Sequence, residues 1–435
     1  MTTFPQTLPV LADGLRSGQI DLLDYLAQLE AHFAQREPDV LAFLPENGRF
    51  PRLRQQARQL LTQFPDPAQR PPLFGVPIGV KDIFHTDGFV TRAGSELPPH
   101  LFRGEEAASV RRLKQAGALI LGKTVTTEFA FFAPGPTRNP HNLAHTPGGS
   151  SSGSAAAVGA MLCPLALGTQ TIGSINRPAA YCGVVGFKPS YGRIHTTGVI
   201  ALAPSLDHVG FFTNDVAGAE LAASLLVDQW QRTPAERRPV LGIPEGPYLA
   251  NATPEGLAHF RQTCVRLEEA GFTIKQAAAM PDFDYLNDNV VALVQAELAQ
   301  VHADWFSQYA DLYQPKTTEL IRLGQQVEDV LVERVRNGRI PFRNILAQLM
   351  DQHGIDLWLS PSAQGAAPCG LASTGSPVMN LPWTYAGLPT LTLLAGFNEA
   401  GLPLGLQLAG RWFEDEMLLA WAEPVESTIS LSHQV

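Results

Sequence analysis

The sequence has little charge, and the smaller share of it is positive. Only 17% of the 435 residues are charged, and 41 acidic side chains outnumber 31 basic ones, which gives a formal net charge of −10. Such a surface offers no general attraction to nucleic-acid phosphates or anionic membranes. We therefore expect no direct nucleic-acid or membrane partner, and a small molecule as the substrate.

Long hydrophobic runs are also missing. The first residues lack the basic and the unbroken apolar stretches of a secretory signal. The longest apolar run of small residues, 155–167, is too short to span a bilayer and contains Pro164. The sequence thus predicts a cytoplasmic protein, monomeric or homo-oligomeric.

Cysteine is scarce, and nothing in its spacing suggests a metal or a disulfide framework. The four cysteines lie far apart without a CxxC pair, and three have apolar neighbours, so buried free thiols are expected. The histidines show no metal-ligand spacing either. We predict no metal and no cofactor. The residues concerned are Cys163, Cys182, Cys264 and Cys369, with His85, His141 and His145.

Helical and strand-like segments alternate along the chain, which is typical of an α/β protein. No repeat, charge block or low-complexity linker marks a boundary, so a single domain, 1–435, is expected. Residues 215–352 are predicted to form a variable helical region that shapes the substrate pocket. Helices are predicted at 13–35, 53–64, 105–116, 152–161, 218–227, 254–270, 285–306, 317–337, 343–350 and 414–423, and strands at 75–84, 118–123, 164–167, 355–361, 389–397 and 401–410.

Two short motifs have the spacing of known functional sites but not their surroundings. Residues 117–124, GALILGKT, match a phosphate-binding loop, yet the four intervening residues are apolar and a helix precedes them, so they predict a strand. Residues 149–153, GSSSG, match a nucleophile elbow centred on Ser151, but a polar loop precedes them instead of a hydrophobic strand. Neither an NTP site nor an α/β-hydrolase is predicted.

The stretch at 168–189, GTQTIGSINRPAAYCGVVGFKP, contains the candidate nucleophile, Ser174. A short apolar run precedes it, and Gly168 and Gly173 allow backbone N–H groups to approach a bound group closely. Several amides beside a serine hydroxyl suit the oxyanion of acyl transfer. Most Gly-Ser turns are plain turns, so this motif needs chemical partners elsewhere.

Lys81 is a candidate partner because it lies on the apolar run GVPIGVKDIF, at 75–84. In such a setting a lysine extends to solvent or pairs with an acid, here the adjacent Asp82. Burial alternatively favours the neutral amine, which is a base. A base at this position needs a route to Ser174, and a hydroxyl from the glycine-serine loop at 148–153 can relay a proton.

Together these segments resemble the amidase signature hydrolases. The blocks that carry the resemblance are GVPIGVKDIF at 75–84, TPGGSSSGSAAAVGA at 146–160 and GTQTIGSINRPAAYCGVVGFKPSYGRI at 168–194, in the order that the family has. GKTVTTEFA at 122–130 and GLPLGLQLAG at 401–410 also fit. The resemblance runs from about residue 13 to residue 423 and is diffuse between 215 and 352.

The resemblance implies a mixed twisted β-sheet covered by helices on both faces, and a Ser-cisSer-Lys triad. Ser174 would attack the substrate carbonyl, and Ser150, on a cis peptide after Gly149, would bridge it to Lys81. Lys81 would act first as general base and then as general acid. The oxyanion hole would consist of the backbone N–H groups of Thr171, Ile172, Gly173 and Ser174.

The nucleophile block departs from the family pattern. The family commonly has Asp at the position of Gln170, often Gly at Ile172 and Arg at Asn176, whereas here the arginine follows one residue later, as Arg177. Gln170 and Arg177 can hydrogen-bond to each other or to the backbone, so the chemistry is expected to survive.

Apolar residues are expected around the acyl group, which favours neutral or aryl amides and leaves carbamates and esters open. Trp383 and Tyr385 are expected on the leaving-group side, with ordinary core packing as the equal alternative. The predicted substrate pocket consists of Ala130, Phe131, Phe132, Gln170 and Arg177.

Two other functions remain open. One is the glutamine-amidase subunit of a tRNA-dependent amidotransferase, which Gln170 and Asn176 do not favour. The other is a catalytically silent binding module of the same fold, which the intact set of Lys81, Ser150 and Ser174 does not favour.

Overall fold

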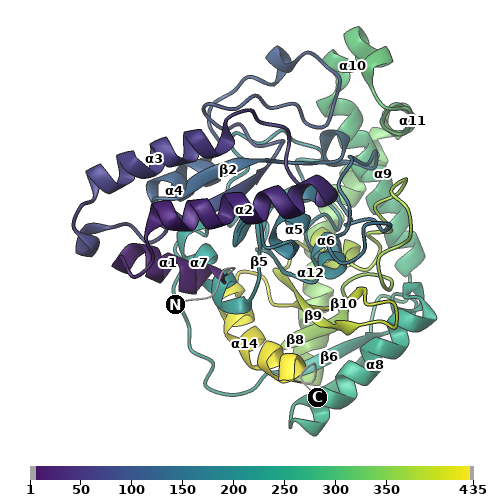
Figure 1. Ribbon diagram of the computed structural model, residues 1–435. Helices are drawn as coiled ribbons and strands as arrows, with labels where there is room; N and C mark the ends of the chain where they lie inside the picture. Colours follow the sequence, from purple (N-terminus) through teal and green to yellow (C-terminus); the bar gives the residue numbers. More distant parts are fainter. Residues whose placement is uncertain (1–5, 432–435) are drawn as a thin grey trace.

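In the computed structural model, which describes residues 6–431, ten strands form one mixed sheet in the order β2-β1-β3-β5-β4-β9-β10-β8-β6-β7 (Figure 1). The strands are β1 (Pro77–Lys81), β2 (Leu119–Thr124), β3 (Leu165–Gln170), β4 (Val185–Lys188), β5 (His208–Thr213), β6 (Val240–Glu245), β7 (Thr273–Ala278), β8 (Leu357–Pro361), β9 (Thr390–Phe397) and β10 (Pro403–Ala409).

Strand direction divides the sheet into three parts. The pairs β2–β1 and β1–β3 are parallel at one edge, and β8–β6 and β6–β7 are parallel at the other. Between them, each strand pairs antiparallel with the next, in the order β3, β5, β4, β9, β10 and β8. The sheet is therefore mixed, as the sequence predicted. Its parallel edge at β1, β2 and β3 brings three carboxyl ends of strands to one place.

Helices cover both faces of the sheet, so the central strands are buried throughout. One layer includes α5 and α6, which pack on each other, and the other includes α7 and α14. The helices are α1 (Leu8–Ser17), α2 (Leu22–Val40), α3 (Arg49–Gln63), α4 (Ala108–Gln115), α5 (Ser152–Gly159), α6 (Asn176–Cys182), α7 (Val216–Leu226), α8 (Pro254–Glu269), α9 (Phe283–Val301), α10 (Ala303–Tyr309), α11 (Pro315–Gly324), α12 (Asp329–His353), α13 (Leu381–Tyr385) and α14 (Asp415–Leu431).

The first predicted helix, 13–35, is two helices in the structure. Gly18 ends α1 in the left-handed conformation, at φ 81°. Asp21 then begins α2 by accepting the backbone N–H groups of Leu23 and Asp24. A glycine followed three residues later by an aspartate is a stop signal and then a start signal, which the continuous apolar pattern obscured.

The region 215–352 is not only helical, contrary to the prediction. It contributes β6 and β7 to the edge of the sheet, and β7 is largely exposed, so its sequence lacks the apolar alternation of a half-buried strand. The helices predicted at 317–337 and 343–350 are instead α11, which ends at Gly324, and a continuous α12 that includes Pro341. In Figure 1, α9 to α11 lie together on the right of the molecule.

Three of the four thiols are buried, whereas Cys369 is exposed in the loop between β8 and α13, which corrects that part of the prediction. Within residues 6–431, no helix has the length and hydropathy to cross a membrane. The same residues hold no group of three or more His, Cys, Asp and Glu side chains placed to bind a metal. Residues 1–5 and 432–435 of the predicted domain lie outside the described residues.

Candidate active site

The candidate residues gather at the carboxyl ends of β1, β2 and β3. Lys81 is the last residue of β1, and the turn that contains Ser174 follows β3 directly. The loop that follows β2 contains Ala130 and Phe131. Because β1 pairs parallel with both neighbours, these three segments leave the sheet at the same edge, where open α/β sheets place their binding sites.

Lys81 is fully buried and bonded to hydroxyl groups rather than to a carboxylate. Its Nζ lies 2.8 Å from Ser150 Oγ and 2.8 Å from Thr169 Oγ1. Burial lowers the pKa of Lys81 well below its ordinary value, and the negative charge of Asp207 opposes this only in part. The amine is therefore biased toward its neutral form, which can accept a proton.

Asp82 does not pair with Lys81, although it follows it in the chain. Its carboxylate lies 2.9 Å from Nζ of Lys123 on β2. In the β1–β2 register Val80 lies opposite Lys123, and successive side chains of a strand point to opposite faces. The motif GALILGKT thus contains a strand, as predicted, and its lysine is held in a buried ion pair that the sequence did not predict.

The loop before α5 is tied to the end of β3. The peptide bond between Gly149 and Ser150 is cis, as the resemblance implied. Ser151 Oγ donates to the carbonyl of Thr169 at 3.1 Å and accepts its N–H at 3.2 Å. Ser151 is therefore a structural link between the loop and β3, and its neighbour Ser150 is held beside Lys81.

The turn at 171–174 leaves its amides free. Within the described part of the chain, the N–H groups of these four residues donate to no protein acceptor, whereas those of Ile175 and Asn176 both donate to Gln170 Oε1 at 2.7 and 2.9 Å. Ser174 is 9% exposed. Among the same residues no hydrogen bond joins Ser174 to Ser150, and catalytic hydrogen bonds often form only with substrate bound.

A small cavity lies against Ser174. Its volume is about 20 Å³, which is room for about one water molecule. Four of the five predicted pocket residues, Ala130, Phe131, Phe132 and Arg177, line it, but Gln170 does not. The other lining residues are Thr171, Ile172, Gly173, Leu202, Val294 and Pro377.

Gln170 lies behind the turn and belongs to a neutral amide network. Its Nε2 donates to Asn176 Oδ1 at 2.9 Å and to Thr384 Oγ1 at 2.8 Å. Thr384 Oγ1 in turn lies 2.7 Å from the carbonyl oxygen of Ile172, to which it donates. The two positions where the family has a carboxylate and a guanidinium thus hold two carboxamides that bond to each other.

Arg177 bonds to backbone and hydroxyl oxygens rather than to Gln170. Its guanidinium donates to the carbonyl of Gly149 at 2.5 Å, to that of Gly375 at 2.7 Å and to Thr374 Oγ1 at 3.2 Å. It connects the start of α6 with the Ser150 loop and with the loop before α13. Burial lowers the pKa of Arg177 to about 10.

The two aromatic residues expected on the leaving-group side lie elsewhere. Trp383 is fully buried and donates to Tyr248 Oη at 3.0 Å. Tyr385 donates to the carbonyl of Val335 at 2.6 Å. Neither lines the cavity at Ser174, so the core-packing alternative describes both.

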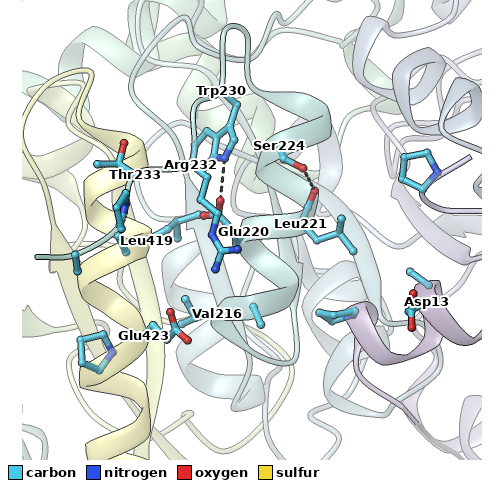
Figure 2. Close-up of a pocket in the computed structure, with 18 of the residues that line it drawn as sticks. Asp13, Val216, Glu220, Leu221, Ser224, Trp230, Arg232, Thr233, Leu419 and Glu423 are labelled. Carbon is cyan, nitrogen blue, oxygen red and sulfur yellow. Dashed lines mark hydrogen bonds between the residues drawn. The ribbon is translucent and has the colours of Figure 1, made fainter.

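A larger cavity, of about 1050 Å³, shares no lining residue with the one at Ser174. It lies between α1, α7 and α14, and Figure 2 shows Trp230 donating to Glu220 along one side of it, with Asp13 and Glu423 at its borders. Its lining includes no serine and lysine placed like Ser150 and Lys81. Cavity size alone therefore does not identify the site.

Sequence reasoning missed three polar residues at the site. Thr169 bonds to Lys81, Thr384 bonds to the carbonyl of Ile172, and Asp207 accepts the hydroxyl of Thr171 at 2.6 Å. Thr169 was within reach of prediction, because it lies near the end of β3 and two residues before Thr171, on the same side of the chain. Thr384 and Asp207 lie far away in the chain, and no local signal marks them.

The fold is of the α/β class, with a mixed sheet between helices, and comparison with known proteins identifies the family. The family model described as Amidase matches residues 48–419. The chain therefore belongs to the amidase family, and it is an amide-hydrolysing enzyme.

Several relatives and solved structures resemble the chain over nearly its whole length. A glutamyl-tRNA(Gln) amidotransferase subunit of Roseiflexus sp. (strain RS-1) is 32% identical, over 95% of this chain and 94% of that protein. A crystal structure described as an amidase superposes with a TM-score of 0.88 at 29% identity, covering 97% of this chain and 99% of that one. The peptide amidase of Stenotrophomonas maltophilia has a TM-score of 0.82 at 25% identity, covering 98% and 97%.

Proposed function

We propose that the enzyme cleaves the C–N bond of its amide substrate through an acyl-enzyme on Ser174, with Ser150 and Lys81 as proton relay and base. One observation carries this proposal: a fully buried lysine lies 2.8 Å from a serine hydroxyl and, among the described residues, bonds to no carboxylate. A charged lysine at such a depth needs a counter-ion, whereas a neutral one needs only hydrogen bonds.

The proposed proton path uses the contact between Lys81 and Ser150 and a second one, between Ser150 and Ser174, that would form with substrate bound. As Ser174 Oγ attacks the carbonyl carbon, its proton passes to Ser150 Oγ while the proton of Ser150 passes to Lys81 Nζ. When the tetrahedral intermediate collapses, the C–N bond breaks and Lys81 returns a proton through Ser150 to the departing nitrogen. Water then attacks the acyl-enzyme along the same path, which releases the acid and restores Ser174.

The oxyanion of each tetrahedral intermediate would be bound by the free amides of Thr171, Ile172, Gly173 and Ser174. Their lack of other acceptors in residues 6–431 supports this role. Removing one such donor typically raises the barrier by about 2.7–4 kcal/mol. The geometry of this turn therefore matters more to the rate than the side chain of Ile172.

The substrates proposed are neutral or aryl amides, with carbamates and esters as further possibilities. Ala130, Phe131 and Phe132 supply an apolar wall, and Val294 on α9 adds a contact from the variable region. Arg177 also borders this cavity. Since the cavity holds about one water molecule, side chains such as Phe132, which is partly exposed, must move to admit a substrate.

Glutamine hydrolysis within a tRNA-dependent amidotransferase is the second candidate. It is supported by the 32% identity to glutamyl-tRNA(Gln) amidotransferase subunits of two Roseiflexus strains. The amide pair of Gln170 and Asn176 is the feature that departs from the usual block of the family. In this case the chain would act with partner subunits and would release ammonia from glutamine only in their presence.

A substrate panel tests these proposals. Purified protein is assayed on aliphatic amides, anilides, aryl esters, carbamates and glutamine, with Ser174→Ala and Ser151→Ala as matched variants. We expect Ser174→Ala to abolish turnover and Ser151→Ala to lower it mainly through stability. Wild-type turnover by Ser174→Ala would disprove the mechanism.

The panel also separates the alternatives. Ammonia release from glutamine only after partner subunits are added would support the amidotransferase role. No turnover on any substrate, together with no labelling of Ser174 by a fluorophosphonate probe, would support a catalytically silent module.

A further inference from the structure

The segment 201–208 packs beside the nucleophile turn without contributing a residue to the proposed triad or oxyanion hole. Within it, both carboxylate oxygens of Asp207 are used. Oδ1 accepts the Thr171 hydroxyl at 2.6 Å, and Oδ2 accepts the backbone N–H groups of Leu202 at 2.8 Å and Ala203 at 3.1 Å. The carboxylate is thus fixed on one side and bound to the nucleophile turn on the other.

Thr171 is the first residue of the proposed oxyanion hole. The peptide before it is held by β3, and the carbonyl of Ile172 accepts Thr384 Oγ1 at 2.7 Å. The contact with Asp207 is the side-chain hydrogen bond of Thr171 itself. The side chain of Thr171 restrains the two peptide units that flank its Cα, so the orientation of the N–H groups of Thr171 and Ile172 depends on Asp207. The carbonyl of Ile172 shares a peptide unit with the N–H of Gly173, so Thr384 orients that third amide.

We propose that Asp207 is a positioning residue for the oxyanion hole, acting through the hydroxyl of Thr171. This inference rests on the proposed function, in which those amides bind the oxyanion. Asp207 does not touch the reacting atoms. Its effect should therefore be on kcat far more than on KM, because the amides are used fully only in the transition state.

Asp207 also lies close enough to Lys81 to affect its protonation. The charged groups that face Asp207 are Lys81 from β1 and Glu297 from α9, and Arg336 of α12 is paired with Glu297 at 2.7 Å. Desolvation raises the pKa of Asp207 to about 6, so it is an anion above that pH. The anion raises the pKa of Lys81, since it favours the protonated amine.

Two variants, Thr171→Val and Asp207→Asn, separate the effect of the hydrogen bond from the effect of the charge. Thr171→Val removes the hydroxyl but keeps the shape and the charge of the site. We expect kcat to fall about 10- to 100-fold, less than the loss of an oxyanion donor, with KM changed less than about twofold and the pH profile unmoved. Thr171→Ser keeps the hydroxyl and is expected to restore most of the activity.

Asp207→Asn removes the charge as well. We expect a similar loss of kcat and, in addition, a shift of the acidic limb of the kcat/KM profile to lower pH, because Lys81 then loses its proton more readily. Asp415→Asn is the matched control: this buried carboxylate also accepts a backbone N–H and a hydroxyl, both from Ser190 at 2.7 Å, but takes no part in the site.

Each result either supports or overturns the positioning role of Asp207. Unchanged kcat in Thr171→Val, or an equal loss of kcat in Asp415→Asn, would overturn the inference. If Asp207→Asn does not fold, the Thr171→Val and Thr171→Ser pair still gives the answer. Turnover by Ser174→Ala would instead overturn the proposed function, so the two failures are distinguishable.

Discussion

Lys81 and Lys123 are two buried lysines on neighbouring parallel strands, and they have different partners. Lys81 is 0% exposed and Lys123 is 4% exposed, and burial lowers the pKa of both. Lys123 bonds to the Asp82 carboxylate, to the carbonyl of Phe84 and to Thr91. Lys81 bonds only to the hydroxyls of Ser150 and Thr169 among the described residues.

The difference separates a lysine that is paired with a carboxylate from one that we propose to act as a base. The β1–β2 register places the two side chains on opposite faces of the sheet, and Asp82 shares a face with Lys123. A carboxylate stabilises the ammonium ion, whereas hydroxyls can also donate to a neutral amine. Burial alone therefore does not identify a catalytic lysine, and the partners do.

The largest contrast is expected when each lysine becomes methionine. Lys81→Met should lower kcat/KM by about 10²- to 10⁴-fold, because general base catalysis is lost, but it should not lower thermal stability, because no ion pair is broken. Enzyme kinetics and a thermal melt measure the two effects. A variant that kept most of its activity would show that Lys81 is not the base.

Lys123→Met should act on stability instead. It leaves the Asp82 carboxylate buried without its cation, which costs about 3–5 kcal/mol of unfolding free energy. Urea denaturation measures this loss, and kcat of the folded fraction should be unchanged. The double variant Lys123→Met/Asp82→Asn should recover most of the stability; no recovery would mean that packing rather than charge is responsible.

The pH dependence of stability should separate the two lysines further. The folded-state pKa of Lys81 lies below its unfolded value, so between these two values the unfolded chain binds the extra proton. The stability penalty of burying Lys81 is thus full below the folded pKa and disappears as pH rises toward about 10.4. In urea titrations across that pH window, the free energy of unfolding of the wild type should rise relative to that of Lys81→Met. Free energies of unfolding that change in parallel with pH would contradict this.

The smallest effects should come from the threonines. Thr169→Val removes one hydrogen bond from Lys81 and should lower kcat/KM about tenfold, which corresponds to about 1.4 kcal/mol. Thr91→Val removes the equivalent contact of Lys123 and should cost about 1–3 kcal/mol of stability without lowering kcat. If both variants lost the same activity, the contacts of Lys81 would have no special role.

Most of the elements near the site were predictable because their patterns are local. The apolar run at 75–84 contains β1, the alanine-rich stretch contains α5, and GALILGKT contains β2. The misses have local causes as well. The edge strand β7 is polar, and the Gly18 stop lies inside a continuous amphipathic pattern.

Not every residue that was predicted to line the pocket borders the cavity at Ser174. Ala130, Phe131 and Arg177 border the cavity, but Gln170 points behind the turn because it lies between two threonines that face Lys81 and Asp207. Trp383 and Tyr385 belong to the core. Residue type indicates what can line a pocket, but strand register and packing decide which side chains do.

The sequence by itself determined the family, the α/β class and the candidate set of Lys81, Ser150 and Ser174, because each stands in a contiguous block that needs no tertiary information. Only the tertiary structure decided which groups touch Lys81. Asp82, its neighbour in the chain, faces away from it, whereas Ser150 and Thr169, far along the chain, lie 2.8 Å from its amine. Lys81 contacts these two hydroxyls instead of Asp82 because side chains alternate along a strand and because β1 and β3 pair in parallel. Contacts between strands that are distant in the chain leave no signature in the local sequence.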